Sequence, residues 1–262
     1  MATGEDIHAE FERNQNAAAE AEAKKAFEDG GADKLTAYAK KKLDEWKTTP
    51  VQIAVVGQSG SGKSSFINTI RDMEDDEDPL FAEVDEEECT RDPKSYALPD
   101  NDLIKLWDLP GAGTSNVKAA EYAEQMEFSK YDAFVLLSCD RFTEIDKMIA
   151  EEIKQIKKPF FFARTKMDNV MRDRKRRLKL KFDHSTASQQ IKGKCLEHLG
   201  KDSQDKIFLI ANLPQPNLKK EFPDIHFGNE DLTAKITQSL PEIQKTALGK
   251  KIMAAYSTFP YS

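Results

Sequence analysis

The stretch Gly57-Gln-Ser-Gly-Ser-Gly-Lys-Ser64 decides the fold, because it matches the pattern G-x-x-x-x-G-K-[ST] of a phosphate-binding loop. The apolar run 51–56 comes directly before it, and residues 65–70 follow with apolar side chains at helical spacing. Such a loop needs a strand before it and a helix after it. The alternative is a glycine-rich turn with an exposed lysine. We expect a phosphate cradle made of Gly57, Ser59, Gly60, Ser61, Gly62, Lys63, Ser64 and Ser65.

The residue types in this loop suit the chemistry of phosphate binding. Glycines let backbone N–H groups face phosphate oxygens without interference from Cβ atoms, and the N-terminus of the following helix adds partial positive charge. Lys63 is expected to reach the β- and γ-phosphates of a nucleotide, and the Ser64 hydroxyl is expected to ligate Mg²⁺. We therefore predict that both side chains take part in catalysis.

A second motif, Asp108-Leu-Pro-Gly111, follows the apolar run 103–107. Phosphoryl-transfer sites hold Mg²⁺ with an aspartate of this kind, and the glycine N–H can contact the γ-phosphate. Ligands gather at the carboxyl ends of strands in open α/β sheets. The position therefore favours Asp108 as a metal ligand and Gly111 as a nucleotide contact, although the tetrapeptide alone is typical of a turn.

A third motif, Thr165-Lys-Met-Asp168, follows the apolar run 159–163 and resembles the N/T-K-x-D sequence with which GTPases read guanine. The Asp168 carboxylate can accept hydrogen bonds from guanine N1–H and the 2-amino group, a pairing that adenine cannot offer. The aliphatic stem of Lys166 can lie over the base. Coming third in this order, the motif changes the expected base from adenine to guanine.

A fourth, weaker candidate is Ala211-Asn212, at the end of the apolar run 206–211. Many GTPases place a small residue there, with its backbone N–H toward guanine O6. Both residues fit by position only, and a plain exit from the strand fits equally well.

Short apolar runs alternate with helical patterns through the middle of the chain, which predicts βαβ units and a mainly parallel sheet. The clearest helix begins at Thr143, where Asp146 completes a capping box. We predict an α/β domain over residues 49–228, preceded by a helical segment (1–48) and followed by a helical tail (229–262). The apolar stripe of the helix after Thr143 consists of Ile145, Met148, Ile149, Ile153 and Ile156.

The first 50 residues are rich in Ala, Glu and Lys and are interrupted by Gly30-Gly31. Apolar side chains recur at helical spacing on both sides of this pair, so we predict two amphipathic helices. Two blocks of charge lie further on. Residues 74–88 hold ten acidic side chains, and residues 172–181 hold seven basic ones. Both blocks are typical of solvated loops, and the basic block could also touch acidic lipid headgroups or a partner.

The whole chain of 262 residues carries a formal net charge of -7, with 39 Lys and Arg against 46 Asp and Glu. This acidic balance argues against a general nucleic-acid binder. No apolar run approaches the roughly 20 residues of a membrane-spanning helix. The N-terminal sequence lacks the apolar segment of a secretory signal, and Ala2 cannot accept a myristoyl group. Three widely spaced cysteines predict free thiols in a reducing cytosol.

The motifs in this order resemble the Ras-like GTPase superfamily. The sequences VQIAVVGQSGSGKSSFINTIRDM, WDLPGAGT, TKMD and KIFLIANL, with the N-terminal helices, resemble the immunity-related (interferon-inducible) GTPase family. The resemblance covers most of residues 33–248. It implies a P-loop G domain with a mostly parallel six-stranded sheet, GTP or GDP bound with Mg²⁺, and hydrolysis of GTP to GDP and phosphate.

The same resemblance implies dynamin-like self-association as a homodimer or homo-oligomer. It also implies a cytoplasmic protein that contacts intracellular membranes peripherally and serves innate, cell-autonomous defence. Family members continue into a second helical domain, whereas only a short tail follows Leu248 here, so the chain is interpreted as truncated, excised or divergent. Its Gly62-Lys63-Ser64 form differs from the family's methionine-containing variant.

A GTPase of this kind needs a segment between the two phosphate motifs that supplies a threonine to Mg²⁺. Thr90 is the candidate, with a surface threonine as the alternative. The resemblance suggests that Glu88 orients the attacking water or contacts the nucleotide of a second subunit. Ala112 follows the Asp108 motif in place of the water-positioning glutamine of Ras. Slow intrinsic hydrolysis, accelerated by a second subunit, is the expected consequence.

Two other classes of function compete with an active GTPase. A nucleotide-binding scaffold, or pseudo-GTPase, would keep the site and lose the hydrolytic cycle. A P-loop ATPase or small-molecule kinase would share the phosphate loop, but the second and third motifs argue against it.

Overall fold

The structure is a computed structural model that describes residues 22, 24–38, 41, 48–73, 78–84, 92–99, 101–112, 119–139, 141–212, 215–222 and 227–257. Its contacts divide the chain into two units, residues 1–49 and residues 50–262, and each is described by itself.

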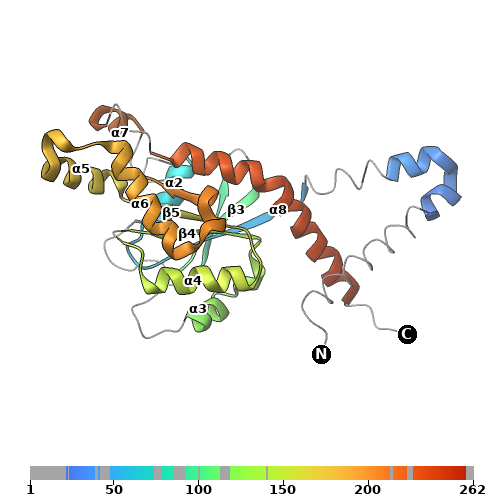
Figure 1. Ribbon diagram of the computed structural model, residues 1–262. Helices are drawn as coiled ribbons and strands as arrows, with labels where there is room; N and C mark the ends of the chain where they lie inside the picture. Colours follow the sequence, from blue (N-terminus) through green and yellow to red (C-terminus); the bar gives the residue numbers. More distant parts are fainter. Residues whose placement is uncertain are drawn as a thin grey trace. The chain divides into compact units, whose positions relative to one another are not determined.

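The first unit contains a helical stretch over residues 24–38 that changes direction at Gly31, drawn in blue in Figure 1. Gly31 has a left-handed φ of 65°. The Tyr38 hydroxyl donates a hydrogen bond of 2.9 Å to Glu22 Oε2. Residues 16 apart in a straight helix would be about 24 Å apart, so the chain must turn back between them. This agrees with the predicted break at Gly30-Gly31, while most of both predicted helices lies outside the described residues.

The second unit is built on a six-stranded sheet with the order β2-β3-β1-β4-β5-β6. Only the β2–β3 pair is antiparallel, and the other four pairs are parallel. This confirms the predicted α/β class and the mostly parallel sheet. The strands are β1 (Val51–Gly57), β2 (Lys94–Leu98), β3 (Asn101–Asp108), β4 (Ala133–Ser138), β5 (Phe160–Arg164) and β6 (Ile207–Leu209).

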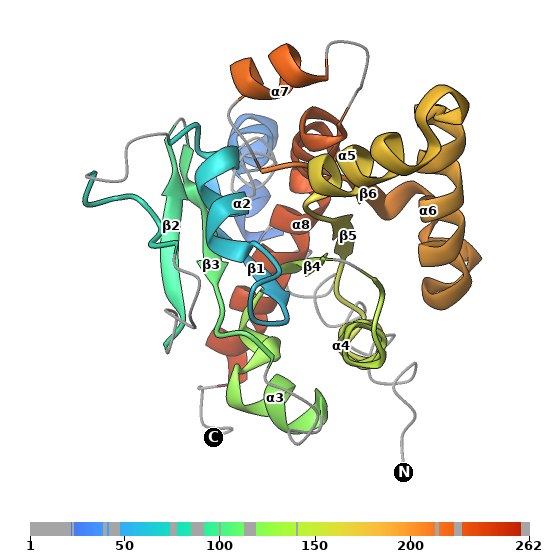
Figure 2. The same cartoon turned by 90° about the vertical axis from the view of Figure 1, so that its left-hand side faces the viewer.

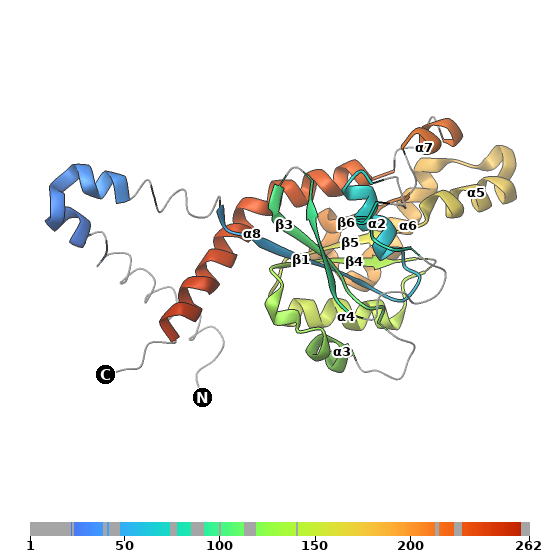
Figure 3. The same cartoon turned by 180° about the vertical axis from the view of Figure 1, so that it is seen from behind.

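Helices cover both faces of this sheet, as the front and back views agree (Figures 1 and 3). α8 crosses one face, and α3 and α4 lie on the other. The α-helices of this unit are α2 (Lys63–Ile70), α3 (Ala119–Gln125), α4 (Glu144–Gln155), α5 (Met167–Leu178), α6 (His184–Leu199), α7 (Gln215–Glu221) and α8 (Asn229–Ser257). The 3-10 helices are η2 (Phe128–Lys130), η3 (Lys179–Lys181) and η4 (Lys201–Lys206).

The alternation of side chains along β1 explains why two separate cores form. Val51, Ile53 and Val55 join the core shared with α2 and α8. Ala54 and Val56 point to the opposite face and join the core shared with α3, α4, α5 and α6. All five side chains are fully buried, as expected for a central parallel strand covered on both faces.

The position of β1 in the sheet determines where the site forms. Its neighbours are β3 on one side and β4 on the other, so the connections that follow β1 and β3 run in opposite directions from it. The carboxyl ends of strands at such a switch point diverge and leave a crevice. Figure 2 shows the sheet from the side at which the carboxyl end of β1 lies, and α2 begins near this end.

The capping box predicted at Thr143 is present. The Thr143 side chain accepts from the Asp146 N–H, and the Asp146 side chain accepts from the Thr143 N–H. Within the predicted apolar stripe, Ile149 and Ile153 are buried, whereas Ile156 at the C-cap is 38% exposed.

One element differs from the sequence-based expectation. Strand β2 was not predicted, because its five residues are exposed or half-buried and show no apolar run. Within the tail predicted as helical over residues 229–262, α8 begins at Asn229 and extends over 29 residues with Pro241 inside it. Among the helices that the structure describes, none combines the length and apolar character needed to cross a bilayer.

Candidate functional site

The phosphate loop occupies the turn between β1 and α2, where its carbonyl groups are held from the protein side. Lys63 Nζ donates to the carbonyl oxygens of Gly57 and Gln58 at 3.4 and 3.2 Å. The Thr165 hydroxyl donates to Ser61 O at 2.7 Å, and Asn212 Nδ2 donates to Gly62 O at 3.1 Å. Because these carbonyls are directed into the protein, the loop keeps the geometry in which N–H groups bind an anion.

Glycines are required at two positions of this loop. Gly57 has a φ of 150°, and a Cβ atom there would lie 2.2 Å from the backbone oxygen of Leu137. Gly62 has a φ of 87°, a left-handed conformation in which it caps α2. A nucleotide phosphate fits this cradle, because backbone curvature of this kind and a helix N-terminus are what anion sites require.

Ser64 and Asp108, the two predicted Mg²⁺ ligands that the structure describes, are in direct contact. The Ser64 hydroxyl at the start of α2 donates to Asp108 Oδ2 at the end of β3, at 2.6 Å. Asp108 is 2% exposed. Hydroxyl and carboxylate oxygens are the hard ligands that Mg²⁺ prefers, so this donor set fits the metal.

The loop after Asp108 lies against the phosphate loop. The Ala112 N–H donates to Gly57 O at 3.1 Å, and Ala112 also forms a parallel bridge with Gln58. A Cβ atom on Gly111 would lie 2.6 Å from the backbone nitrogen of Ser59. The structure therefore brings the two predicted phosphate-contacting motifs within backbone contact.

The third motif lies where β5 enters α5. Lys166 adopts a left-handed φ of 54° and caps the helix. Asp168 is in the first turn of α5, and its carboxylate is 8% exposed. Thr165 is fully buried and binds the phosphate loop, so its hydroxyl connects the predicted base-reading motif to the predicted phosphate cradle.

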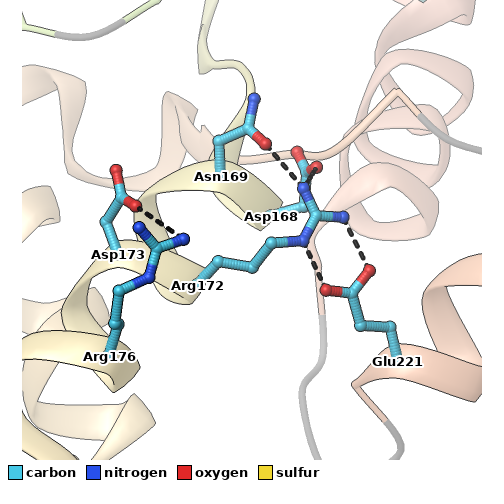
Figure 4. Close-up of polar contacts among 6 residues, drawn as sticks. All are labelled: Asp168, Asn169, Arg172, Asp173, Arg176 and Glu221. Atoms are coloured by element: carbon cyan, nitrogen blue, oxygen red, sulfur yellow. Dashed lines mark hydrogen bonds and ion pairs between the residues drawn. The ribbon is translucent and has the colours of Figure 1, made fainter.

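Asp168 is held by a charged neighbour that the sequence analysis did not identify (Figure 4). Arg172, one turn later on α5, lies with Nη1 3.0 Å from Asp168 Oδ2. The same guanidinium binds Glu221 at the end of α7 through Nε and through Nη2, the latter at 2.6 Å. Hydrogen bonding to Glu221 is the main cause that raises the pKa of Arg172.

The fourth motif differs from its expected geometry at one atom. The Ala211 N–H donates to Asn229 Oδ1 at 3.1 Å, and Asn229 Nδ2 donates back to Ala211 O at 2.9 Å. In this structure that N–H is therefore directed to the start of α8 and not to a base. Asn212 is half-buried, and its Oδ1 atom has no hydrogen-bond partner among the described residues.

A groove of about 1150 Å³ lies between α2 and α8. Ser65 and Asn212 line it together, and Asn229 borders it as well. These residues come from separate segments of the chain, so the structure places Ser65 of the first motif and Asn212 of the fourth on the same groove.

Gln58, within the phosphate loop, extends the site toward α4. Its amide donates to the Thr143 hydroxyl at 2.6 Å and lies 3.3 Å from Asp146 Oδ1. Asp146 is fully buried and also accepts from Ser138 Oγ at 2.8 Å. The capping box of α4 thus anchors one side of the phosphate loop.

Two predicted residues, Thr90 and Glu88, lie outside the described residues, so their roles stay predictions. The residues that the sequence analysis missed are Arg172, Asn229 and Gln58. Arg172 is four positions after Asp168, the spacing of neighbours on one helix face, and this was the available signal.

Comparisons with known proteins agree with this geometry. The model of the family described as interferon-inducible GTPase (IIGP) matches residues 18–257. Interferon-inducible GTPase 5 of Rattus norvegicus is 35% identical over 233 residues, which are 86% of this chain and 50% of that protein. Interferon-gamma-inducible GTPase 10 of Mus musculus is 31% identical over 232 residues, 86% of this chain and 55% of that protein. The chain spans about half the length of these relatives.

A solved structure, the LeoA bacterial dynamin GTPase from ETEC, aligns with 97% of this chain and 47% of its own, with a TM-score of 0.51 and 17% identity. At that identity the likeness concerns the fold alone, and it agrees with a P-loop GTPase architecture. The resemblance seen in the sequence is confirmed by the family match over most of the chain. The chain belongs to the interferon-inducible GTPase family.

Proposed function

We propose that this chain binds GTP with Mg²⁺ and hydrolyses it to GDP and phosphate. The observation that carries the proposal is the contact of Ser64 Oγ with Asp108 Oδ2 at 2.6 Å, directly beside the phosphate loop. A hydroxyl from the phosphate loop and a carboxylate from the end of the next parallel strand form the Mg²⁺ ligand set of P-loop NTPases.

Each described group has a part in this proposal. Lys63 balances the charge of the β- and γ-phosphates, and the N–H groups of the loop bind the remaining phosphate oxygens. Mg²⁺, when bound by Ser64 and Asp108, would neutralise charge that develops on the phosphate oxygens. Asp168 selects guanine, because its carboxylate accepts from two donors that adenine does not present together.

The test compares nucleotide binding and phosphate release by the purified chain. Lys63→Ala removes the cation that faces the phosphates, and we expect most of the GTP affinity to be lost. Lys194→Ala is the matched control, because it removes the same charge from an exposed position on α6, outside the loop. If both variants bind GTP like the unaltered chain, the proposed phosphate site is wrong.

Self-association is the second part of the proposal. Ala112 occupies the position at which Ras carries its water-orienting glutamine, so we infer that a second copy completes the hydrolytic site. Thr90 would supply a ligand to Mg²⁺, and Glu88 would orient the attacking water or contact the nucleotide of the second copy. Phosphate release per molecule should then rise with protein concentration, and a non-hydrolysable GTP analogue should increase the apparent mass in gel filtration. A rate that stays constant contradicts self-activation, and the absence of any phosphate release favours the pseudo-GTPase.

Peripheral contact with an anionic intracellular membrane is the third part, together with a role in innate defence. It is supported by the basic tip, which we define as residues 174–181 at the end of α5 and in η3. Leu180 is fully exposed there, between the exposed Lys179 and Lys181. Figures 1 and 3 agree that the tip lies at the edge of residues 50–262. Each basic side chain near an anionic surface contributes about 1 kcal/mol.

Flotation with phosphatidylcholine vesicles, with and without phosphatidylserine, tests the membrane proposal. Binding should require phosphatidylserine and should weaken in Leu180→Asp but not in Ile156→Asp, which changes another exposed apolar residue. Equal flotation of the unaltered chain with both kinds of vesicle, or equal flotation of the two variants, would refute the membrane proposal.

A further inference from the structure

Arg172 occupies the centre of a network that joins α5 to α7 (Figure 4). Its Nη1 atom lies 2.6 Å from Asn169 Oδ1 and 3.0 Å from Asp168 Oδ2. Its Nε and Nη2 atoms bind the two carboxylate oxygens of Glu221. A bidentate arginine–carboxylate pair is among the strong and directional polar contacts of proteins, so Arg172 has a defined orientation.

The α7 side of this network is anchored in the core. Leu218 and Phe222 are 3% and 4% exposed. The Arg172 guanidinium carbon lies 5.6 Å from the centroid of the Phe222 ring. Phe222 in turn meets Phe227 edge-on at 5.5 Å. The position of Glu221 therefore depends on the docking of α7, because its neighbour Phe222 is buried only when that segment is in place.

Asp168 is the residue whose carboxylate must face both N1–H and the 2-amino group of guanine. A carboxylate rotates about its terminal bond, and each orientation other than the productive one loses at least one of these two contacts. Arg172 binds one oxygen of Asp168 and limits that rotation. A chain of contacts thus leads from α7 through Glu221 and Arg172 to the atom that reads the base.

We propose that Arg172 is a positioning residue for guanine recognition, and that Glu221 makes this positioning depend on the docking of α7. The proposal rests on guanine being the base that Asp168 reads. Arg172 acts through Asp168 and not on the nucleotide itself. Any partner that displaces α7 would release Arg172 and lower the selectivity for guanine.

The test measures the affinities of GDP and of inosine diphosphate, which lacks the 2-amino group. In Arg172→Gln we expect the affinity for GDP to fall by about tenfold, the effect of losing a hydrogen bond to a charged group. The affinity for inosine diphosphate should fall by less, because that base makes one contact fewer with Asp168. The ratio of the two affinities therefore decreases.

Arg176 on the same helix offers a matched control. Its side chain is 81% exposed and lies 3.8 Å from Asp173, with neither partner in contact with Asp168. Arg176→Gln should leave both affinities and their ratio unchanged. Glu221→Gln keeps Arg172 and should shift the ratio in the same direction by a smaller factor, so it decides the question if Arg172→Gln does not fold.

The outcomes separate this inference from the proposed function. If the unaltered chain does not prefer guanine to adenine nucleotides, the proposed function fails. If it prefers guanine, and Arg172→Gln and Glu221→Gln weaken both diphosphates equally or not at all, Arg172 has a merely structural role and the inference is overturned. A decreased ratio in these variants, with no change in Arg176→Gln, supports it.

Discussion

Adding one methyl group at Gly111 tests whether the two phosphate-contacting loops lie as close as the structure places them. A Cβ atom there would lie 2.6 Å from Ser59 N and 2.7 Å from Ser59 Cα. Both are backbone atoms, so no side-chain rotation relieves the overlap, and one loop must shift by about 0.8 Å to reach ordinary contact. Overpacking of this kind costs about 1–3 kcal/mol.

The assay for Gly111→Ala combines thermal unfolding with the binding of a fluorescent GDP analogue. Each kcal/mol lowers the Tm of a domain of this size by about 2–4 °C. We also expect weaker nucleotide binding, because the shift pulls the Ala112 N–H away from Gly57 O, a contact of 3.1 Å that joins the loops.

Gly193→Ala makes the same chemical change in an open position. No atom lies within 4 Å of the added Cβ, and Gly193 is exposed within α6. Because alanine favours a helix over glycine by about 0.5–1 kcal/mol, this variant should be more stable and bind nucleotide normally. If Gly111→Ala keeps the Tm and the affinity of the unaltered chain, the loops are not in contact and the site geometry is wrong.

Three further expectations follow from single side chains. Thr143→Val removes the hydroxyl that accepts from the Asp146 N–H, and urea titration should show a free energy of unfolding lower by about 1–2 kcal/mol; an unchanged midpoint would contradict the capping role. Burial raises the pKa of the Cys195 thiol to about 11, so alkylation at pH 8, followed by mass spectrometry of its peptide, should be roughly 100-fold slower than in the unfolded chain, and equal rates would be the contrary result. Hydrogen bonding from Arg172 lowers the pKa of Glu221 below its ordinary value of 4.5, so the ion pair is complete above that value and is lost as the pH falls through the lowered pKa. The ratio of GDP affinity to inosine diphosphate affinity should therefore be constant from pH 8 to pH 6. A decrease of this ratio within that range would count against the role of the ion pair.

The parts of the site that the sequence predicted are those whose residues are neighbours along the chain. The phosphate loop follows a buried strand directly, so the types and spacing of its residues specify both the turn and the helix that follows. Asp108 was predicted from its place after a strand, because the carboxyl ends of parallel strands meet at one edge of a sheet. The mostly parallel sheet could also be predicted, because β1, β4 and β5 are nearly continuous apolar runs, as is typical of buried parallel strands.

The parts that the sequence did not predict depend on contacts between distant residues. β2 is an edge strand whose exposed side chains carry no apolar pattern, and it is defined only by its pairing with β3. Arg172 stands at the start of a basic block whose other members are mostly exposed. Its spacing of four from Asp168 is the one signal that separates it from them, and its other partner Glu221 lies 49 positions away.

The contacts of Thr165 and Asn212 change the interpretation of the motifs as separate readers of base and phosphate. Both residues belong to motifs that were associated with the base, yet their side chains donate to Ser61 O and Gly62 O in the phosphate loop. These bonds direct the loop carbonyls away from the anion before any nucleotide arrives, so less ordering is needed on binding. They also couple the two ends of the site, because a movement of the segment that carries Thr165 or Asn212 would break its hydrogen bond to the phosphate loop. If the chain binds GTP as proposed, its affinity for guanine and its affinity for phosphate are therefore coupled through Thr165 and Asn212.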